Sequence, residues 1–123
     1  MKKVFVRAAS LVIPFLVSST VLAQTNSLPT YSATEAAKHV GEYATVADKV
    51  VGLGRSQRGD ICLEMGGKYP NQAFMAVISV KSAWKFSDYR KYVGQMVAVF
   101  GKIILDRKKP IIFVSTRTQF VLR

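Results

Sequence analysis

The sequence has one cysteine and one histidine in 123 residues, and this scarcity limits its disulfide and metal chemistry. Cys62 has no partner in the chain for an internal disulfide, so it must be buried, free or paired with another molecule, and we predict that it is buried in a strand. His39 has no cysteine or carboxylate cluster beside it at the spacing of metal ligands. We therefore predict no metal site and no bound cofactor.

Motifs for catalysis are also scarce. No serine stands in a nucleophile elbow, and the glycine-containing segment 52–59 leads into a predicted strand instead of the helix that follows a phosphate-binding loop. Gly59 and Asp60 match a fragment of the metal-binding strand of thermonucleases, but Asp48, Asp60 and Glu64 have no downstream partner motif. We predict that the protein is not an enzyme and has no catalytic residues.

The N-terminal apolar stretch falls short of the roughly 20 residues that a membrane-spanning helix needs. Lys2, Lys3 and Arg7 begin the chain, Ala8–Val17 is nearly all apolar, and Val21-Leu22-Ala23 has small residues where a signal peptidase cleaves. This pattern predicts a signal peptide at 1–23 and a periplasmic or secreted product with no stable membrane insertion after cleavage. A retained membrane anchor is the alternative.

Acidic residues are few. The chain has 18 Lys and Arg against seven Asp and Glu, and 15 of these basic residues follow residue 23. Such an excess attracts nucleic acid, anionic lipid or acidic polysaccharide. Charge does not choose among these ligands, and an exported domain can be basic without binding anything through that charge.

The 100 residues after the predicted signal peptide are enough for one hydrophobic core. Residues 24–32 contain Asn, Ser and Pro and are predicted to form a flexible leader, so the folded domain is expected at 33–123. One short helix is predicted after Thr34. A second is predicted before Gly94, with Ser87 or Asp88 as its N-cap. Apolar alternation predicts five strands, at 42–51, 61–65, 74–80, 96–105 and 111–114.

Five strands with a helix between the third and the fourth follow the chain order of the OB-fold, a small Greek-key barrel. The predicted fold class is mainly β, a five-stranded OB-fold barrel with one short helix before strand 1 and one between strands 3 and 4. A five-stranded barrel of another topology, or an open sandwich, is the alternative, because strand order in sequence does not fix pairing in space.

Several stretches add a family resemblance, namely Ala37–Glu42, Gly67–Phe74, Val97–Ile103, Lys109–Ile112 and Thr118–Phe120. Through them the chain resembles exported bacterial OB-fold domains of the nucleic-acid-binding, tRNA-anticodon-binding-like type. The resemblance implies a ligand across the face of strands 2 and 3. It leaves the ligand open, because OB domains bind single-stranded DNA, RNA, oligosaccharides or proteins.

Both loops that flank this expected face are basic, and an aromatic residue in the turn after strand 2 is placed to stack on a base, at roughly 1–3 kcal/mol per base. We predict that these residues bind single-stranded nucleic acid or another polyanion. In the alternative the loop charges are simply solvated and the aromatic ring packs next to Pro70. The predicted ligand-binding residues are Arg55, Arg58, Tyr69, Arg107, Lys108 and Lys109.

Four aromatic residues, Trp84, Phe86, Tyr89 and Tyr92, lie between the third and fourth predicted strands. Their spacing fits a short helix whose rings fill the end of the barrel, so a core role is favoured over base stacking. The competing function for the whole chain is a protein-interaction or envelope-stress module that offers a strand edge or a loop surface to an exported protein.

Overall fold

The computed structural model describes residues 27–86 and 88–123. The predicted signal peptide at 1–23 and the first part of the predicted leader lie outside the described residues, as does Ser87. Within the described ranges, no helix is long and apolar enough to cross a membrane.

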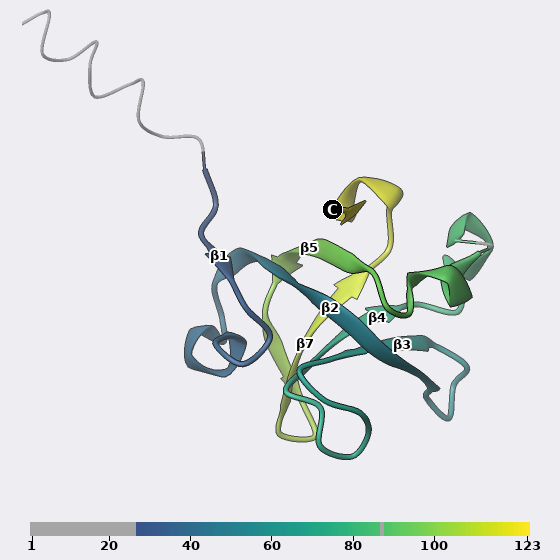
Figure 1. Cartoon of the computed structure of the whole chain (residues 1–123), viewed down its shortest axis with the longest axis horizontal. Helices are drawn as coiled ribbons and strands as arrows, with labels where there is room; N and C mark the ends of the chain where they lie inside the picture. Colours follow the sequence, from purple (N-terminus) through teal and green to yellow (C-terminus); the bar gives the residue numbers. More distant parts are fainter. Residues whose placement is uncertain (1–26, 87) are drawn as a thin grey trace, which may run out of the picture.

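Eight strands form one mixed sheet (Figure 1). The hydrogen-bonded order is β6-β7-β4-β3-β2-β5-β8, an open path, and β1 pairs in parallel with β2. The strands are β1 (Thr30–Tyr31), β2 (Tyr43–Arg55), β3 (Ile61–Met65), β4 (Phe74–Ile78), β5 (Met96–Lys102), β6 (Ile104–Asp106), β7 (Lys109–Val114) and β8 (Phe120–Leu122). The prediction of a five-stranded OB-fold barrel is therefore wrong, and two residues of the predicted leader belong to the sheet.

The helices in the described residues are short 3-10 turns: η2 (Ala36–His39), η3 (Ala83–Phe86), η4 (Tyr89–Tyr92) and η5 (Arg117–Gln119). The predicted helix between the third and fourth strands is thus also wrong. Aromatic residues are poor helix formers, Asp88 makes no capping hydrogen bond through its side chain, and its backbone (φ −107°, ψ 37°) lies outside the helical region. Two separate turns replace one helix.

β2 is longer than the predicted strand because two glycines continue it. Its first part pairs with β5, its second part pairs with β3, and the register shifts between Val50 and Gly52. Gly52 and Gly54 lie opposite Glu64 and Cys62 of β3, and a Cβ on Gly54 would meet Glu64 Oε2 at 3.0 Å. The glycines therefore leave room for the Glu64 side chain and do not end the strand.

The predicted fourth strand is divided at Ile103. This side chain is fully buried, its N–H donates to the Glu42 carbonyl at 2.9 Å, and its carbonyl accepts from Gly41 N–H at 2.7 Å. These bonds turn the chain toward η2, so β5 ends before Ile103 and β6 begins after it.

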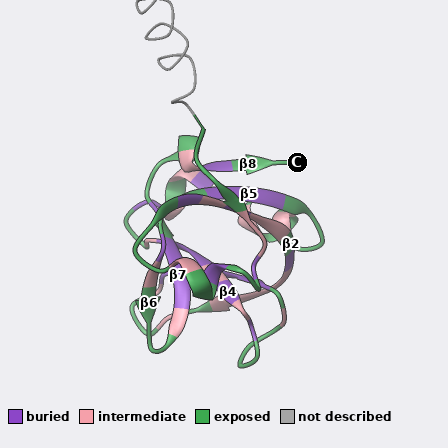
Figure 2. Ribbon diagram, turned by 90° about the vertical axis from the view of Figure 1, so that its left-hand side faces the viewer, coloured by how far each residue is buried: buried purple, intermediate pink, exposed green. Residues whose placement is uncertain are grey.

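The main core lies inside the curved sheet, where buried residues line the facing strands (Figure 2). All five residues of β3 are buried. Cys62 is one of them, unbonded and packed with Val77 and Ile111 in a second cluster on the other face, so its predicted burial in a strand is confirmed. Burial, followed by the nearby Asp60 carboxylate, raises the pKa of the Cys62 thiol above its ordinary value.

Candidate polyanion-binding surface

Two predicted site residues, Arg55 and Arg58, lie at the end of the molecule formed by the β2–β3 loop and the segment 79–93. Arg55 Nη2 donates to Tyr89 Oη at 2.7 Å, and its guanidinium lies 5.9 Å from the centre of the Tyr89 ring. Arg90 lies 4.9 Å from the same ring. Tyr89 therefore contacts two arginines, both within cation–π distance of its ring.

The buried carboxylate of Asp60 fixes the β2–β3 loop. Asp60 Oδ1 accepts from Val80 N–H at 2.9 Å, and Oδ2 accepts from Arg58 Nη2 at 3.1 Å. The Asp60 side chain is 6% exposed, whereas that of Arg58 is 75% exposed. The pair thus anchors one side of the Arg58 guanidinium and leaves the rest open to solvent, next to Lys81.

Trp84 is 76% exposed, so its predicted place in the core is wrong. The prediction is confirmed for Phe86, which is 3% exposed, and in part for Tyr89 and Tyr92, which are half-buried against the core. Because η3 ends before a second turn, its aromatic residues do not share one helical face. The sequence signal that could have predicted a surface site here is the pair of lysines near Trp84, Lys81 and Lys85.

We call the basic residues gathered here the cationic end. Lys85 Nζ lies 5.7 Å from the Trp84 ring, in cation–π range, and donates to the Ser115 carbonyl at 3.1 Å. Within the described residues, two carboxylates pair with this group, Asp60 with Arg58 and Asp88 with Lys91. Positive charge is therefore in excess at this end of the molecule, which also carries the exposed Trp84 ring. The cationic end comprises Arg55, Arg58, Lys81, Lys85, Arg90 and Lys91.

The other four predicted site residues lie together at the opposite end of β3, which we call the loop end (Tyr69, Arg107, Lys108 and Lys109). The Tyr69 side chain is exposed, and its backbone N–H donates to Glu64 Oε1 at 3.1 Å. Lys109 Nζ donates to the Gln72 carbonyl at 2.9 Å, so the β6–β7 turn lies beside the β3–β4 loop (Figure 1). Arg107 and Lys108 form the exposed tip of that turn.

The strip between the two ends has the length of β3, five residues or roughly 13 Å. Glu64, which is 5% exposed, lies on it, and its carboxylate rests against Gly52 and Gly54. The Lys68 side chain also reaches the position of Gly52. The predicted residues therefore form two separate basic clusters, one at each end of this strip.

Metal chemistry has no support in the described parts of the chain, where no three His, Cys, Asp or Glu side chains come together as ligands. His39 instead stacks on Tyr31, with 3.7 Å between ring centres, and its Nδ1 lies 2.8 Å from Glu42 Oε2. These contacts hold the β1 segment on η2.

No protein-family model matches the chain, and no curated protein matches it. Among solved structures, it is similar to OBody AM1L10 bound to hen egg-white lysozyme, with 16% identity, a TM-score of 0.55, and coverage of 81% of this chain and 98% of that one. OBody AM3L15, also bound to hen egg-white lysozyme, gives 16% identity, a TM-score of 0.54, and coverage of 76% and 92%. At this identity the likeness concerns the fold alone.

Proposed function

We propose that this chain is an exported, non-enzymatic protein that binds single-stranded nucleic acid or a similar polyanion through the cationic end. The observation that carries the proposal is that one end of the molecule holds the six basic residues of the cationic end together with Trp84, which is 76% exposed and has Lys85 Nζ 5.7 Å from its ring. Basic side chains neutralise phosphates, and an exposed ring stacks on a base whatever its sequence. The phosphate and the base of a nucleotide therefore each have a matching group, basic side chains and an exposed ring, at this end of the molecule.

Export is proposed from the pattern of residues 1–23, and the ligand class from the surface. The loop end offers a second contact of the same kind, with Tyr69 as its ring and Arg107 and Lys108 as its exposed charges.

Fluorescence anisotropy of a labelled single strand, titrated with the full chain, tests this proposal. We expect saturable binding that survives near-physiological salt and competition by heparin. Trp84 is the only tryptophan of the chain, so quenching of its emission should follow the same titration. Absence of binding, or loss of binding in heparin, would exclude nucleic acid as the ligand.

A pair of charge reversals locates the surface. Lys81→Glu with Arg90→Glu should weaken strand binding at least tenfold (about 1.4 kcal/mol), because two phosphate contacts become repulsive. Neither residue pairs with a carboxylate in the described structure, so the fold should survive. Lys38→Glu with Lys102→Glu changes the charge equally on exposed sites elsewhere. Equal loss in both pairs would mean that net charge, and not the cationic end, drives binding.

A protein partner is the second candidate, favoured by a separate surface. Phe100, Phe113 and Val121 are exposed by 37%, 41% and 53%. Gln119 Nε2 donates to both the Phe100 and the Phe113 carbonyls, at 3.1 and 2.9 Å, so the two phenylalanines lie near each other. Both OBody structures hold a protein partner. Apolar binding would persist as salt rises, whereas polyanion binding would weaken.

A further inference from the structure

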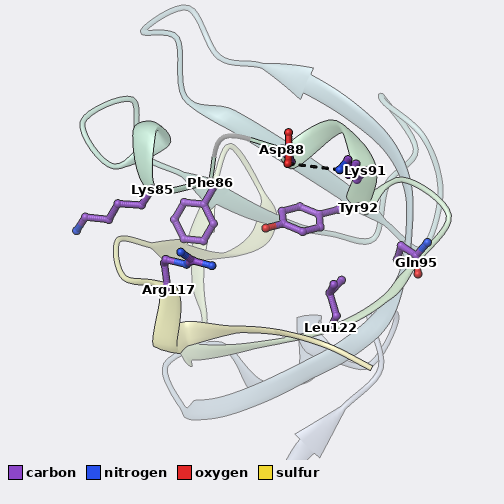
Figure 3. A pocket seen from close by; sticks show the side chains of 8 residues that line it. All are labelled: Lys85, Phe86, Asp88, Lys91, Tyr92, Gln95, Arg117 and Leu122. Atoms are coloured by element: carbon purple, nitrogen blue, oxygen red, sulfur yellow. Dashed lines mark ion pairs between the residues drawn. The ribbon is translucent and has the colours of Figure 1, made fainter.

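A pocket of about 450 Å³ lies between the η3–η4 turns and the C-terminal segment that contains η5 and β8 (Figure 3). It is separate from the strip along β3 and β4. Its lining combines two kinds of group, aromatic or aliphatic side chains and basic ones. The residues that matter here are Phe86, Tyr92 and Leu122 of the first kind, and Lys85, Lys91 and Arg117 of the second.

The apolar wall is fixed by the core. Tyr92 packs on Phe120 with 4.6 Å between ring centres, and Phe86 meets the same ring edge-on at 6.2 Å. Tyr92 is half-buried and Leu122 is 54% exposed, so both keep surface toward the pocket. An aromatic ring of a ligand finds here a preformed face to stack on.

The basic side is also held in place. Arg117 begins η5, whose capping box between Thr116 and Gln119 fixes the turn. Figure 3 shows the Arg117 guanidinium on the same side of the pocket as Phe86 and directed toward Tyr92. Lys91 lies across the pocket and pairs with Asp88 at 3.4 Å.

The charge of the lining selects the ligand. Lys85 donates to the Ser115 carbonyl and Lys91 pairs with Asp88, whereas Arg117 is in no ion pair among the described residues. The Arg117 charge suits the charge of about −1.5 to −2 on a phosphate monoester at pH 7. A guanidinium binds phosphate through two parallel hydrogen bonds. A purely apolar ligand would bury these charges without partners, which is unfavourable.

We propose that this pocket binds a ring-bearing phosphate monoester, of the class of a nucleoside 5′-monophosphate, with the ring on Tyr92 and the phosphate on Arg117. The volume falls in the range of small-molecule sites, about 300–1,000 Å³. The same chemistry has two sources, a free nucleotide and the 5′-phosphorylated end of a strand. The pocket shares Lys85 and Lys91 with the cationic end, but the proposal does not rest on the function proposed above, because its ring face and Arg117 lie outside that cluster.

Calorimetric titration of the full chain with adenosine 5′-monophosphate, adenosine, ribose 5-phosphate and inorganic phosphate tests the proposal. We expect the monophosphate to bind at least about tenfold more tightly than each of the other three, because it alone uses both sides of the pocket. Equal affinity for inorganic phosphate, or no binding of the monophosphate, would overturn the proposal.

Arg117→Met removes the guanidinium and keeps an apolar stem on an exposed site. It should weaken binding of the monophosphate at least about tenfold, because the charge-assisted hydrogen bonds from the guanidinium to the phosphate are lost. Lys102→Met, at the far end of β5, removes one charge away from the pocket and should leave the affinity unchanged. An unchanged affinity in Arg117→Met would place the ligand elsewhere.

The two sources of the ligand are separated with linear 5′-phosphorylated and circular single strands of one sequence. If the pocket takes strand ends, the linear form binds more tightly, and Arg117→Met removes that difference. If it takes free nucleotides, both forms bind alike while the monophosphate still binds. Failure of both strands to bind would overturn the polyanion function and leave the monophosphate result to decide on the pocket.

Discussion

Gln72 shows at the scale of one residue how the loop end is built. Its side chain is 2% exposed, its Nε2 lies 3.2 Å from Met75 Sδ, and its backbone carbonyl accepts from Lys109 Nζ. Among the described residues, the buried Oε1 atom has no hydrogen-bond donor. A buried carbonyl oxygen without a partner costs about 1–3 kcal/mol. The Gln72 side chain therefore lowers the free energy of unfolding, although the Gln72 backbone carbonyl helps to order the loop.

Gln72→Met should therefore stabilise the protein. Methionine fills a similar volume with no unpaired oxygen, and its backbone carbonyl still accepts from Lys109. We expect the free energy of unfolding, measured in urea, to rise by about 1 kcal/mol. Gln57→Met, on an exposed loop position, should change it by less than about 0.5 kcal/mol. A loss of stability in Gln72→Met would mean that Oε1 has a donor in solution.

Single residues also mark the limit of what the sequence predicts for the site. The basic loops and Tyr69 could be found because charges and turn formers are readable locally. The grouping of Arg55 with Tyr89 and Arg90 could not, since it joins residues 34 positions apart through one 2.7 Å hydrogen bond. The exposure of Trp84 depends on where a turn ends, which aromatic spacing alone does not determine.

At the scale of elements, the strands with regular apolar alternation were the predictable ones. The strand predicted at 61–65 is β3 as observed, and those predicted at 74–80 and 111–114 overlap β4 and β7. The break at Ile103 was not predictable, because hydrogen bonds to the distant Gly41 and Glu42 cause it. The pairing of β1 with β2 likewise rests on long-range contacts.

The attachment of β1 has its own electrostatic cause. Glu42 accepts from Tyr31 Oη at 2.8 Å and contacts His39 Nδ1 at 2.8 Å. The hydrogen bond with His39, and then that with Tyr31, lowers the pKa of Glu42 below its ordinary value, while the bond to Glu42 raises the pKa of Tyr31. His39 belongs to η2 and Tyr31 to β1, so the ionised Glu42 favours the attached segment through its bond with Tyr31.

The sign of this pKa shift predicts how β1 responds to acid. A lowered pKa contributes stability that is present above the ordinary value of 4.5 and is lost as pH falls through the lower folded value. The Thr45 amide, which donates to the Pro29 carbonyl at 2.8 Å, reports the attachment. Its protection from hydrogen exchange should fall below about pH 4.5, before that of the Val50 amide, which donates to the Gln95 carbonyl.

Glu42→Gln provides the control for this prediction. It should lower the protection of Thr45 at neutral pH and flatten its dependence on acid, while Val50 keeps its protection. If Thr45 and Val50 lost protection together in the wild-type chain, the acid response would be global unfolding and not release of β1.

The whole molecule carries its charge unevenly, and this unevenness sets how a long ligand would bind. The cationic end and the loop end lie at opposite ends of β3, with the buried Glu64 carboxylate between them. A short strand can occupy one basic cluster, whereas a longer one can reach both clusters across the strip that holds Glu64. Ligand length should therefore decide whether the loop end contributes.

Salt dependence measured on two strand lengths tests this arrangement. For single strands, each phosphate neutralised contributes a slope of about −0.7 to log affinity against log salt. Arg107→Asn with Lys108→Gly removes two charges but keeps the turn, because both positions have positive φ (52° and 72°) and Asn-Gly is the pair that such turns favour.

We expect this variant to reduce the slope by up to about 1.4 for a strand of about 16 nucleotides and to leave a strand of about 4 nucleotides nearly unchanged. The short strand stays on the cationic end, which has more basic side chains. Lys38→Gln with Lys102→Gln, which removes the same charge elsewhere, should change neither slope. An equal reduction for both lengths would mean that one basic cluster, the loop end, holds strands of every length, and the cationic end would lose its assigned role.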